Sequence, residues 1–221
     1  MCGIKGHLFR QVALAFGWMD SGRDRRERAM RFMGILWDTL RKNASHTRIQ
    51  LETWLQGLDI AAAAVADVGG KKLPVKDRVK SWNVERYDTL DLPEYDLNQP
   101  WELEEIYDAV FCLEVFEYIY NPLQAMKNLS NILKPGGVLY VSFHFVYPHH
   151  DAQHLDYLRY TGWGVDKLLE EAKFRSWERY PRTFKRPWIM GHVYSSEKMR
   201  GNDYNLGKLH GEQGYLVMAR K

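Results

Sequence analysis

The chain contains few cysteines and no long apolar run. Its two cysteines, Cys2 and Cys112, lie far apart among 221 residues, so the sequence has neither a disulfide framework nor the Cys and His spacing of a metal site. It also lacks the roughly 18 consecutive apolar residues that a membrane-spanning helix needs, and an uninterrupted apolar segment of the signal-peptide type. We therefore expect a cytoplasmic protein in a reducing setting, with no bound metal and no membrane association.

A strong charge of one sign is also missing. The chain carries 31 Lys and Arg against 28 Asp and Glu, a formal net charge of +3. Such a small excess argues against nucleic acid as a partner. The basic residues between positions 23 and 42 alternate with Asp24, Glu27 and Asp38, which is typical of a solvated helix face. An acidic partner is the alternative interpretation.

The first part of the chain has a helical pattern. From residue 4 to about residue 58, apolar residues recur at helical spacing, which predicts two or three helices. In the last of these, over residues 46–60, one apolar side is expected to consist of Ile49, Leu51, Trp54, Leu55 and Leu58. We expect residues 1–58 to form an N-terminal helical extension that packs on or caps the domain that follows.

From residue 59 onward, short apolar runs alternate with helical segments. The expected strands lie within residues 61–70, 85–92, 105–115, 136–145 and 211–221, and the expected helices within 121–137 and 164–174. Alternation of this kind indicates βα units, and there are too few units to close an eight-stranded barrel. The pattern predicts an α/β fold over residues 59–221: a Rossmann-like, doubly wound, mainly parallel sheet.

Ligands of such sheets bind beyond the carboxyl ends of the strands. After the first strand come Asp67, Gly69 and Gly70, and glycines allow close backbone approach and a positive φ, although a glycine pair also occurs in ordinary turns. Asp91 follows the second strand, about 20 residues beyond the glycines, a spacing at which a carboxylate can accept hydrogen bonds from ribose hydroxyls. Capping a turn before Pro93 is an equal alternative for Asp91.

A longer stretch carries a specific resemblance. Residues 107–145 read YDAVFCLEVFEYIYNPLQAMKNLSNILKPGGVLYVSFHF, in which a strand ends in Leu-Glu, a helix follows Asn-Pro, and Leu-Lys-Pro-Gly-Gly precedes the next strand. The chain thereby resembles the class I S-adenosylmethionine-dependent methyltransferases, over roughly residues 47–180. The segment YPHHDAQHLDYLRYT and residues 164–174 resemble bacterial members of the family, many of which are linked to sugar and surface-polysaccharide pathways.

The resemblance implies S-adenosylmethionine as methyl donor. It assigns donor binding to Asp67, Gly69, Gly70, Asp91, Leu113 and Glu114, with Asp96 nominated for the adenine contact on a short third strand near residues 95–98. The family's usual first motif has three glycines at alternate positions, whereas Lys71 and Lys72 follow the glycine pair here. This departure leaves a non-catalytic, methyltransferase-like binding or scaffold protein as the alternative. A nicotinamide-dependent dehydrogenase would need G-x-G-x-x-G, which the chain lacks.

The methyl acceptor is expected to bind near residues 143–161. Transfer to a hydroxyl or amine requires alignment and removal of a proton, and this segment concentrates histidines and aromatic residues after a strand. We expect His150 to accept the proton and Arg159 to orient a polar or anionic substrate. In the alternative interpretation the loop only packs on the core and Arg159 pairs with a carboxylate. The expected function is methylation of a small molecule, such as a sugar or sugar nucleotide.

Overall fold

The computed structural model describes residues 46–103, 106–147, 149, 155–184 and 212–221. These residues belong to one compact unit, Ala44–Lys221. The helices expected before residue 46 and the candidate His150 lie outside the described residues.

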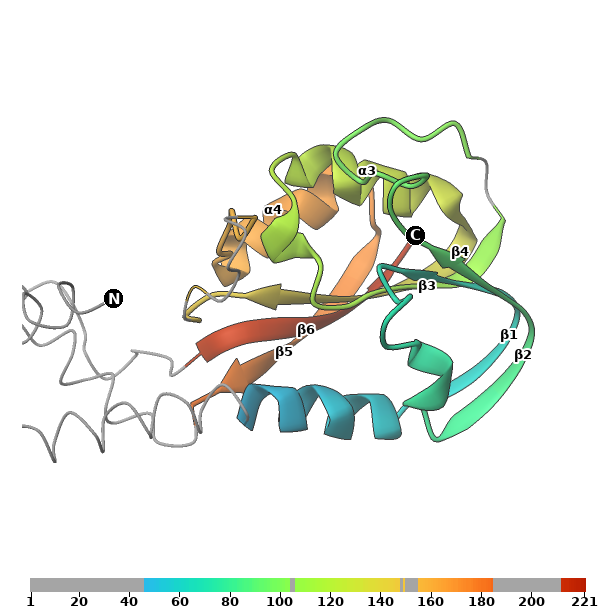
Figure 1. Cartoon of the computed structure of the whole chain (residues 1–221), viewed down its shortest axis with the longest axis horizontal. Coiled ribbons are helices and arrows are strands. Elements are labelled where there is room, and N and C mark those ends of the chain that lie inside the picture. Colours follow the sequence, from blue (N-terminus) through green and yellow to red (C-terminus); the bar gives the residue numbers. More distant parts are fainter. Residues whose placement is uncertain (1–45, 104–105, 148, 150–154, 185–211) are drawn as a thin grey trace, which may run out of the picture. The chain divides into compact units, whose positions relative to one another are not determined.

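In the described part of the chain, six strands form one sheet in the order β2-β1-β3-β4-β6-β5 (Figure 1). Their bounds are β1 Asp59–Val68, β2 Ser81–Leu90, β3 Tyr107–Cys112, β4 Leu133–His144, β5 Ser176–Thr183 and β6 Glu212–Arg220. Strands β1 to β4 pair in parallel, and β6 lies antiparallel between β4 and β5. The expected Rossmann-like, mainly parallel sheet is confirmed.

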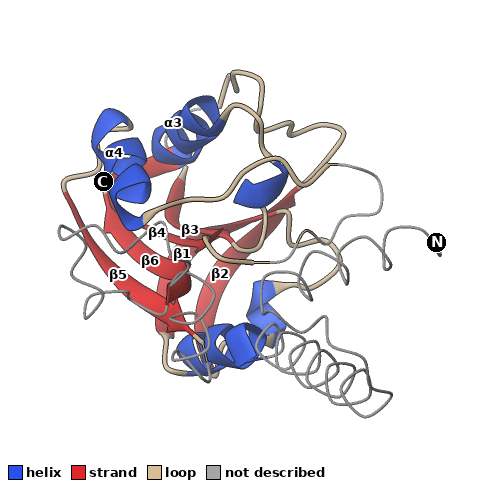
Figure 2. Ribbon diagram, turned by 90° about the vertical axis from the view of Figure 1, so that its left-hand side faces the viewer, coloured by secondary structure: helices blue, strands red, loops and turns tan. Residues whose placement is uncertain are grey.

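Helices cover both faces of this sheet. Helices α3 (Pro122–Ile132) and α4 (Gly162–Glu171) lie on one face, and the helix of residues 46–56 lies on the other (Figure 2). Helix α3 has a proline in its first turn, where the missing N–H costs nothing, and the Thr161 side chain caps α4 by accepting from the Gly164 N–H. Two 3₁₀ turns, η1 (Val75–Asp77) and η2 (Phe116–Tyr118), follow β1 and β3. Among the described residues, no helix is long and apolar enough to cross a membrane.

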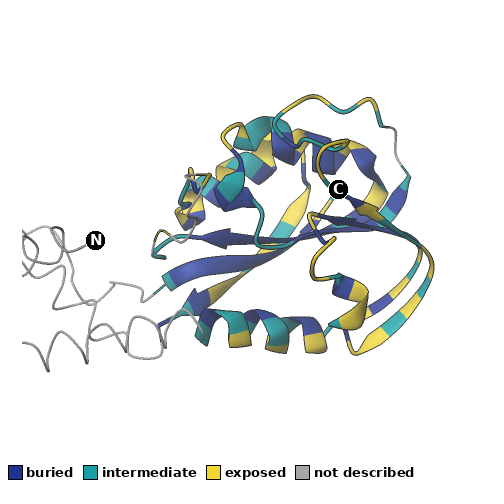
Figure 3. Ribbon diagram, viewed as in Figure 1, coloured by how far each residue is buried: buried dark blue, intermediate teal, exposed yellow. Residues whose placement is uncertain are grey.

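Adjacent residues of the central strands pack on opposite sides. Ala66 of β1 joins the core beneath α3 and α4, whereas its neighbour Val65 joins the core that contains Leu51 and Leu55 of the helix 46–56. The central strands are therefore buried on both faces (Figure 3), which explains their nearly continuous apolar sequences. The expected division of the chain at residue 58 stays a prediction. The helix 46–56 lies before that boundary, yet its Leu51 and Leu55 pack in one core with residues of the sheet.

Two expectations about local structure were wrong, and one strand was not predicted. Residues 95–98 form an irregular loop that ends in a turn instead of a third strand, and the Asn98 side chain accepts from the backbone N–H groups of Tyr120 and Asn121, which fastens this loop to the start of α3. Strand β5 was not expected. Ile49 lies on the exposed side of its helix, with 60% of its surface accessible.

The helix 46–56 supplies a stability test with a matched control. Leu51 is completely buried, so Leu51→Ala should lower the free energy of unfolding by about 2–5 kcal/mol, because it leaves a cavity in the core. Ile49→Ala, on the exposed side of the same helix, should change it by about 0.5 kcal/mol or less. Urea denaturation of both variants measures the difference, and equal losses would contradict the packing described here.

Candidate functional site

Three strands end in register at the carboxyl edge of the sheet. Val68, the last residue of β1, pairs with Leu90 of β2 on one side and with Cys112 of β3 on the other. Consequently Gly69, Asp91 and Leu113, which follow these strands, lie at the same edge of the sheet. At this edge the chain continues from β1 to β2 on one side, while β3 lies on the other side of β1. Crevices of this kind bind ligands in open α/β sheets, so the structure brings together three of the residues predicted to bind the donor.

Gly69 occupies a position that requires glycine. Its φ is +78°, its N–H donates to the Leu90 carbonyl at 2.9 Å, and an added Cβ would lie 2.6 Å from Cγ2 of Val115. A side chain here would be strained and would collide with Val115. Close approach of a donor to this backbone stays a prediction.

Asp67 and Gly70 maintain the shape of this loop from within. The buried Asp67 carboxylate accepts from the Val75 N–H at 2.8 Å and from the Tyr87 hydroxyl at 2.6 Å, and a Cβ at Gly70 would overlap that carboxylate. Burial raises the pKa of Asp67, and the hydrogen bonds from Tyr87 and Val75 oppose this rise. A direct contact of either residue with the donor stays a prediction.

Asp91 and Asp96 both make hydrogen bonds within turns. Asp91 Oδ1 accepts from the Leu92 N–H at 2.8 Å, which is the turn-capping arrangement expected as one alternative, while Oδ2 has no hydrogen-bond partner among the described residues. Asp96 Oδ1 accepts from the backbone and side-chain nitrogens of Asn98, each at 2.9 Å. The predicted ribose and adenine contacts of these two carboxylates remain untested.

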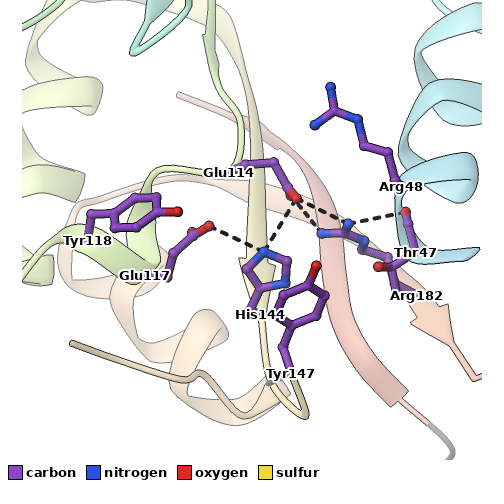
Figure 4. Close-up of a pocket in the computed structure, with 8 residues that line it drawn as sticks. All are labelled: Thr47, Arg48, Glu114, Glu117, Tyr118, His144, Tyr147 and Arg182. Atoms are coloured by element: carbon purple, nitrogen blue, oxygen red, sulfur yellow. Dashed lines mark hydrogen bonds and ion pairs between the residues drawn. The ribbon is translucent and has the colours of Figure 1, made fainter. Parts of the chain in front are cut away.

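A cluster of charged side chains lies at the ends of strands β3, β4 and β5, of which β5 is separated from β4 by β6. Glu114, which follows β3, has a φ of +58°, a conformation that costs a residue with a side chain about 1–3 kcal/mol. Its Oε1 accepts from the Ser142 hydroxyl at 2.8 Å and from Arg182 at 2.7 Å. Arg182, in β5, also donates to the Thr47 carbonyl at 3.1 Å. These bonds hold Glu114 in its strained conformation and join the helix 46–56 to the strand ends (Figure 4).

His144, the last residue of β4, lies between two carboxylates. Its Nε2 is 3.3 Å from Oε2 of Glu114 and 3.2 Å from Oε1 of Glu117, a residue of η2 (Figure 4). Burial lowers the pKa of His144, but the hydrogen bonds to the two glutamates outweigh it and raise this pKa to about 9. Burial raises the pKa of Glu114, but His144 and Arg182 outweigh it and hold that pKa well below its usual range. At neutral pH both His144 and Glu114 are therefore charged.

These side chains line a cavity of about 390 Å³, a volume within the range of small-molecule sites. The lining residues are Thr47, Arg48, Glu114, Glu117, Tyr118, His144, Tyr147 and Arg182 (Figure 4). The ring of Tyr147 stacks on that of His144, with centroids 4.2 Å apart. The cavity adjoins the donor edge, because Leu113 and Glu114 are consecutive residues.

Several of these residues were not singled out by the sequence. Glu117 had a signal, its spacing of three residues from Glu114, and His144 stood among four histidines after the expected strand. Arg182 had none, because its strand was not predicted. Arg159 forms an ion pair with Asp156 and donates to the Tyr147 carbonyl at 3.3 Å, the internal pairing expected as one alternative for this side chain.

Comparison with known proteins gives a consistent family match. A family model described as "Methyltransferase domain" matches residues 18–198, more than four fifths of the chain. A Thermotoga maritima structure described as a possible histamine N-methyltransferase has 12% identity and a TM-score of 0.51, covering 88% of this chain and 97% of that one. A Haloferax volcanii protein solved in complex with the methyltransferase activator Trm112 has 14% identity and a TM-score of 0.51, covering 79% and 88%. No curated protein matches the chain.

The buried His144 makes stability depend on pH. Because its pKa is raised in the folded protein to about 9, above the usual value of about 6.5 for unfolded chains, the stabilisation is complete below about pH 6.5 and is lost as the pH rises through about 9. Between these limits the wild type should lose about 1–3 kcal/mol more unfolding free energy than His144→Gln, since one pKa unit corresponds to about 1.4 kcal/mol. Urea denaturation at a series of pH values measures this, and parallel profiles would contradict it.

Proposed function

Since the chain belongs to the methyltransferase domain family, that of the S-adenosylmethionine-dependent class I enzymes, we propose that it methylates a small molecule, a sugar or a sugar nucleotide. The observation that carries the proposal is the common edge at which Gly69, Asp91 and Leu113 follow three strands that end in register. The sugar assignment rests on the resemblance of residues 147–161 and 164–174 to sugar-pathway methyltransferases.

In this proposal the donor binds at that edge. The backbone of Gly69, which has a positive φ and no side chain, contacts the donor. Oδ2 of Asp91, the oxygen that does not accept from the Leu92 N–H, accepts from its ribose. When bound, S-adenosylmethionine supplies a methyl group on a positively charged sulfur. Leu113 and Glu114 adjoin the adenosine part, and Asp96 faces the adenine. The roles of the chain are to bind the two reactants in line, to exclude water and to accept a proton from the acceptor.

The proposed proton acceptor is His150, in the segment after β4. Arg159 remains the proposed orienting group, acting from a guanidinium that is already fixed by Asp156 and the Tyr147 carbonyl. A cytoplasmic setting is also part of the proposal, and it rests on the sequence, in which the two cysteines are far apart.

Donor binding tests the proposal directly. S-adenosylhomocysteine, the product of the donor, should bind the wild type in calorimetry, and at 100 times its dissociation constant it should stabilise the fold by about 2.7 kcal/mol. Gly69→Val should abolish this binding, because the added side chain collides with Val115 and displaces the loop at which the donor is proposed to bind. Absence of binding to the wild type would overturn the proposal and favour the non-catalytic alternative.

Gly136→Val is the matched control. Gly136 also has a positive φ, +80°, but an added Cβ there would meet nothing within 4 Å, and it lies near the amino end of β4, away from the donor edge. The two substitutions impose a similar backbone strain, but only the one at Gly69 also collides with a neighbouring side chain and lies at the proposed donor site, so only this change should affect donor affinity. Equal affinities in the two variants would refute the placement of the donor at Gly69.

A substitution at His150 tests the proposed proton acceptor. His150→Ala should lower turnover by about 100-fold or more, in keeping with general-base contributions, while the affinity for S-adenosylhomocysteine stays at the wild-type value. His149→Ala, which removes an exposed neighbouring imidazole, is the control and should retain activity. Release of S-adenosylhomocysteine measures turnover, and full activity of His150→Ala would leave this loop without a role in proton transfer.

A further inference from the structure

Among the buried polar atoms of residues that line the cavity, Oε2 of Glu117 and Nε of Arg182 have no hydrogen-bond partner within the described part of the chain. Each of these two residues has only 1% of its surface accessible. An unpaired carboxylate oxygen or guanidinium N–H in a buried position is costly, and native structures rarely retain one without a reason. The pair indicates a ligand that both donates and accepts hydrogen bonds.

The two glutamates of the cavity differ in how far they are satisfied. The Glu114 carboxylate accepts from Ser142, Arg182 and His144. Oε1 of Glu117 lies beside Nε2 of His144, the same nitrogen that contacts Glu114. Oε2 of Glu117 accepts from no described group. Glu117 is therefore the carboxylate that can accept a hydrogen bond from a ligand without losing an existing partner.

The charges of the four innermost residues of the lining cancel. Glu114 and Glu117 are opposed by Arg182 and by His144, which the two carboxylates keep protonated. The remaining cation of the lining, Arg48, has a side chain that is 42% exposed, and it shares the Glu52 carboxylate with Arg78. A charged ligand group would lose its hydration without gaining an uncompensated counter-charge, whereas a hydroxyl loses less on burial and can both donate and accept.

We propose that this cavity binds the methyl acceptor through an uncharged hydroxyl group, which donates to Oε2 of Glu117 while an adjacent oxygen of the same molecule accepts from Nε of Arg182. The inference rests on the proposed function and narrows it to neutral, hydroxyl-bearing acceptors instead of amines, carboxylates or phosphates. Tyr118 and Tyr147 of the lining supply aromatic surface suited to the apolar face of a sugar ring.

Three glycosides that differ in one substituent test the charge of the acceptor. Methyl α-D-glucopyranoside is neutral, its 2-amino-2-deoxy analogue is a cation at pH 6.5, and its 6-carboxylate analogue is an anion. Saturation-transfer NMR of the full-length wild type, with and without S-adenosylhomocysteine, should show the neutral glycoside binding about 10-fold or more tightly than either charged one. Tighter binding of a charged probe, or saturable binding of none, overturns the inference.

A substitution at Glu117 tests the contact itself. In Glu117→Gln the amide oxygen should occupy the Oε1 position, because it can accept from the His144 Nε2–H. The amide NH₂ then replaces the free carboxylate oxygen and cannot accept a hydrogen bond from the ligand. The affinity for the neutral glycoside should fall about 10-fold, as for loss of a charge-assisted hydrogen bond. Glu170→Gln, an exposed site on α4, is the control and should bind as the wild type does. No loss in Glu117→Gln, or an equal loss in both variants, contradicts the contact.

Affinity for S-adenosylhomocysteine separates this inference from the proposed function. Glu117→Gln should bind S-adenosylhomocysteine as the wild type does, because its change lies on the acceptor side. If the wild type binds the glycoside but not S-adenosylhomocysteine, the proposed function fails; if it binds S-adenosylhomocysteine but prefers a charged glycoside, this inference fails. Should Glu117→Gln not fold, as judged by circular dichroism, the comparison of the three glycosides on the wild type decides alone.

Discussion

The buried ion pair between Arg182 and Glu114 connects parts of the chain that no short-range interaction could bring together. Arg182 comes from β5 and Glu114 from the turn after β3, and the same guanidinium reaches the Thr47 carbonyl in the helix 46–56. A guanidinium this deeply buried requires a carboxylate partner. Removing Glu114 leaves the Arg182 guanidinium without a carboxylate in the interior, and removing Arg182 leaves His144 as the cation that pairs with Glu114. The strained turn at Glu114, the end of β5 and the start of the helix are joined by this interaction.

The sheet was predictable from the sequence where burial on both faces makes a strand continuously apolar. Residues 61–68 and 107–112 have this character, and both form strands. The failures have a physical cause as well. Strand β5 pairs with β6 alone and contains polar residues and Pro181, which a strand at the edge of a sheet tolerates. The loop of residues 95–98 is held by hydrogen bonds to the Asn98 side chain from Tyr120 and Asn121. No local sequence pattern predicts hydrogen bonds between residues so far apart in the chain.

The candidate site was predictable only in part. Gly69 and Asp91 could be predicted because a glycine after a strand and an acidic residue at the end of the next strand form a local sequence motif. The cavity is different: Glu114, His144 and Arg182 are separated by long stretches of sequence and become neighbours only when β3, β4 and β5 share one edge. Glu117 had a local signal, but the significance of its free oxygen depends on the Nε2–H of His144, which Glu117 shares with Glu114.

The position of β6 determines the order in which the sheet can be assembled during synthesis. This strand, Glu212–Arg220, lies between β4 and β5, although it follows both in the chain. While a ribosome adds about 5–20 residues per second, β4 emerges several tens of residues before its antiparallel neighbour, and the apolar edge of β4 stays unpaired for some seconds. Nascent chains are thus exposed to edge-to-edge aggregation in this interval, and a message truncated before residue 212 would leave β4 and β5 with no strand between them.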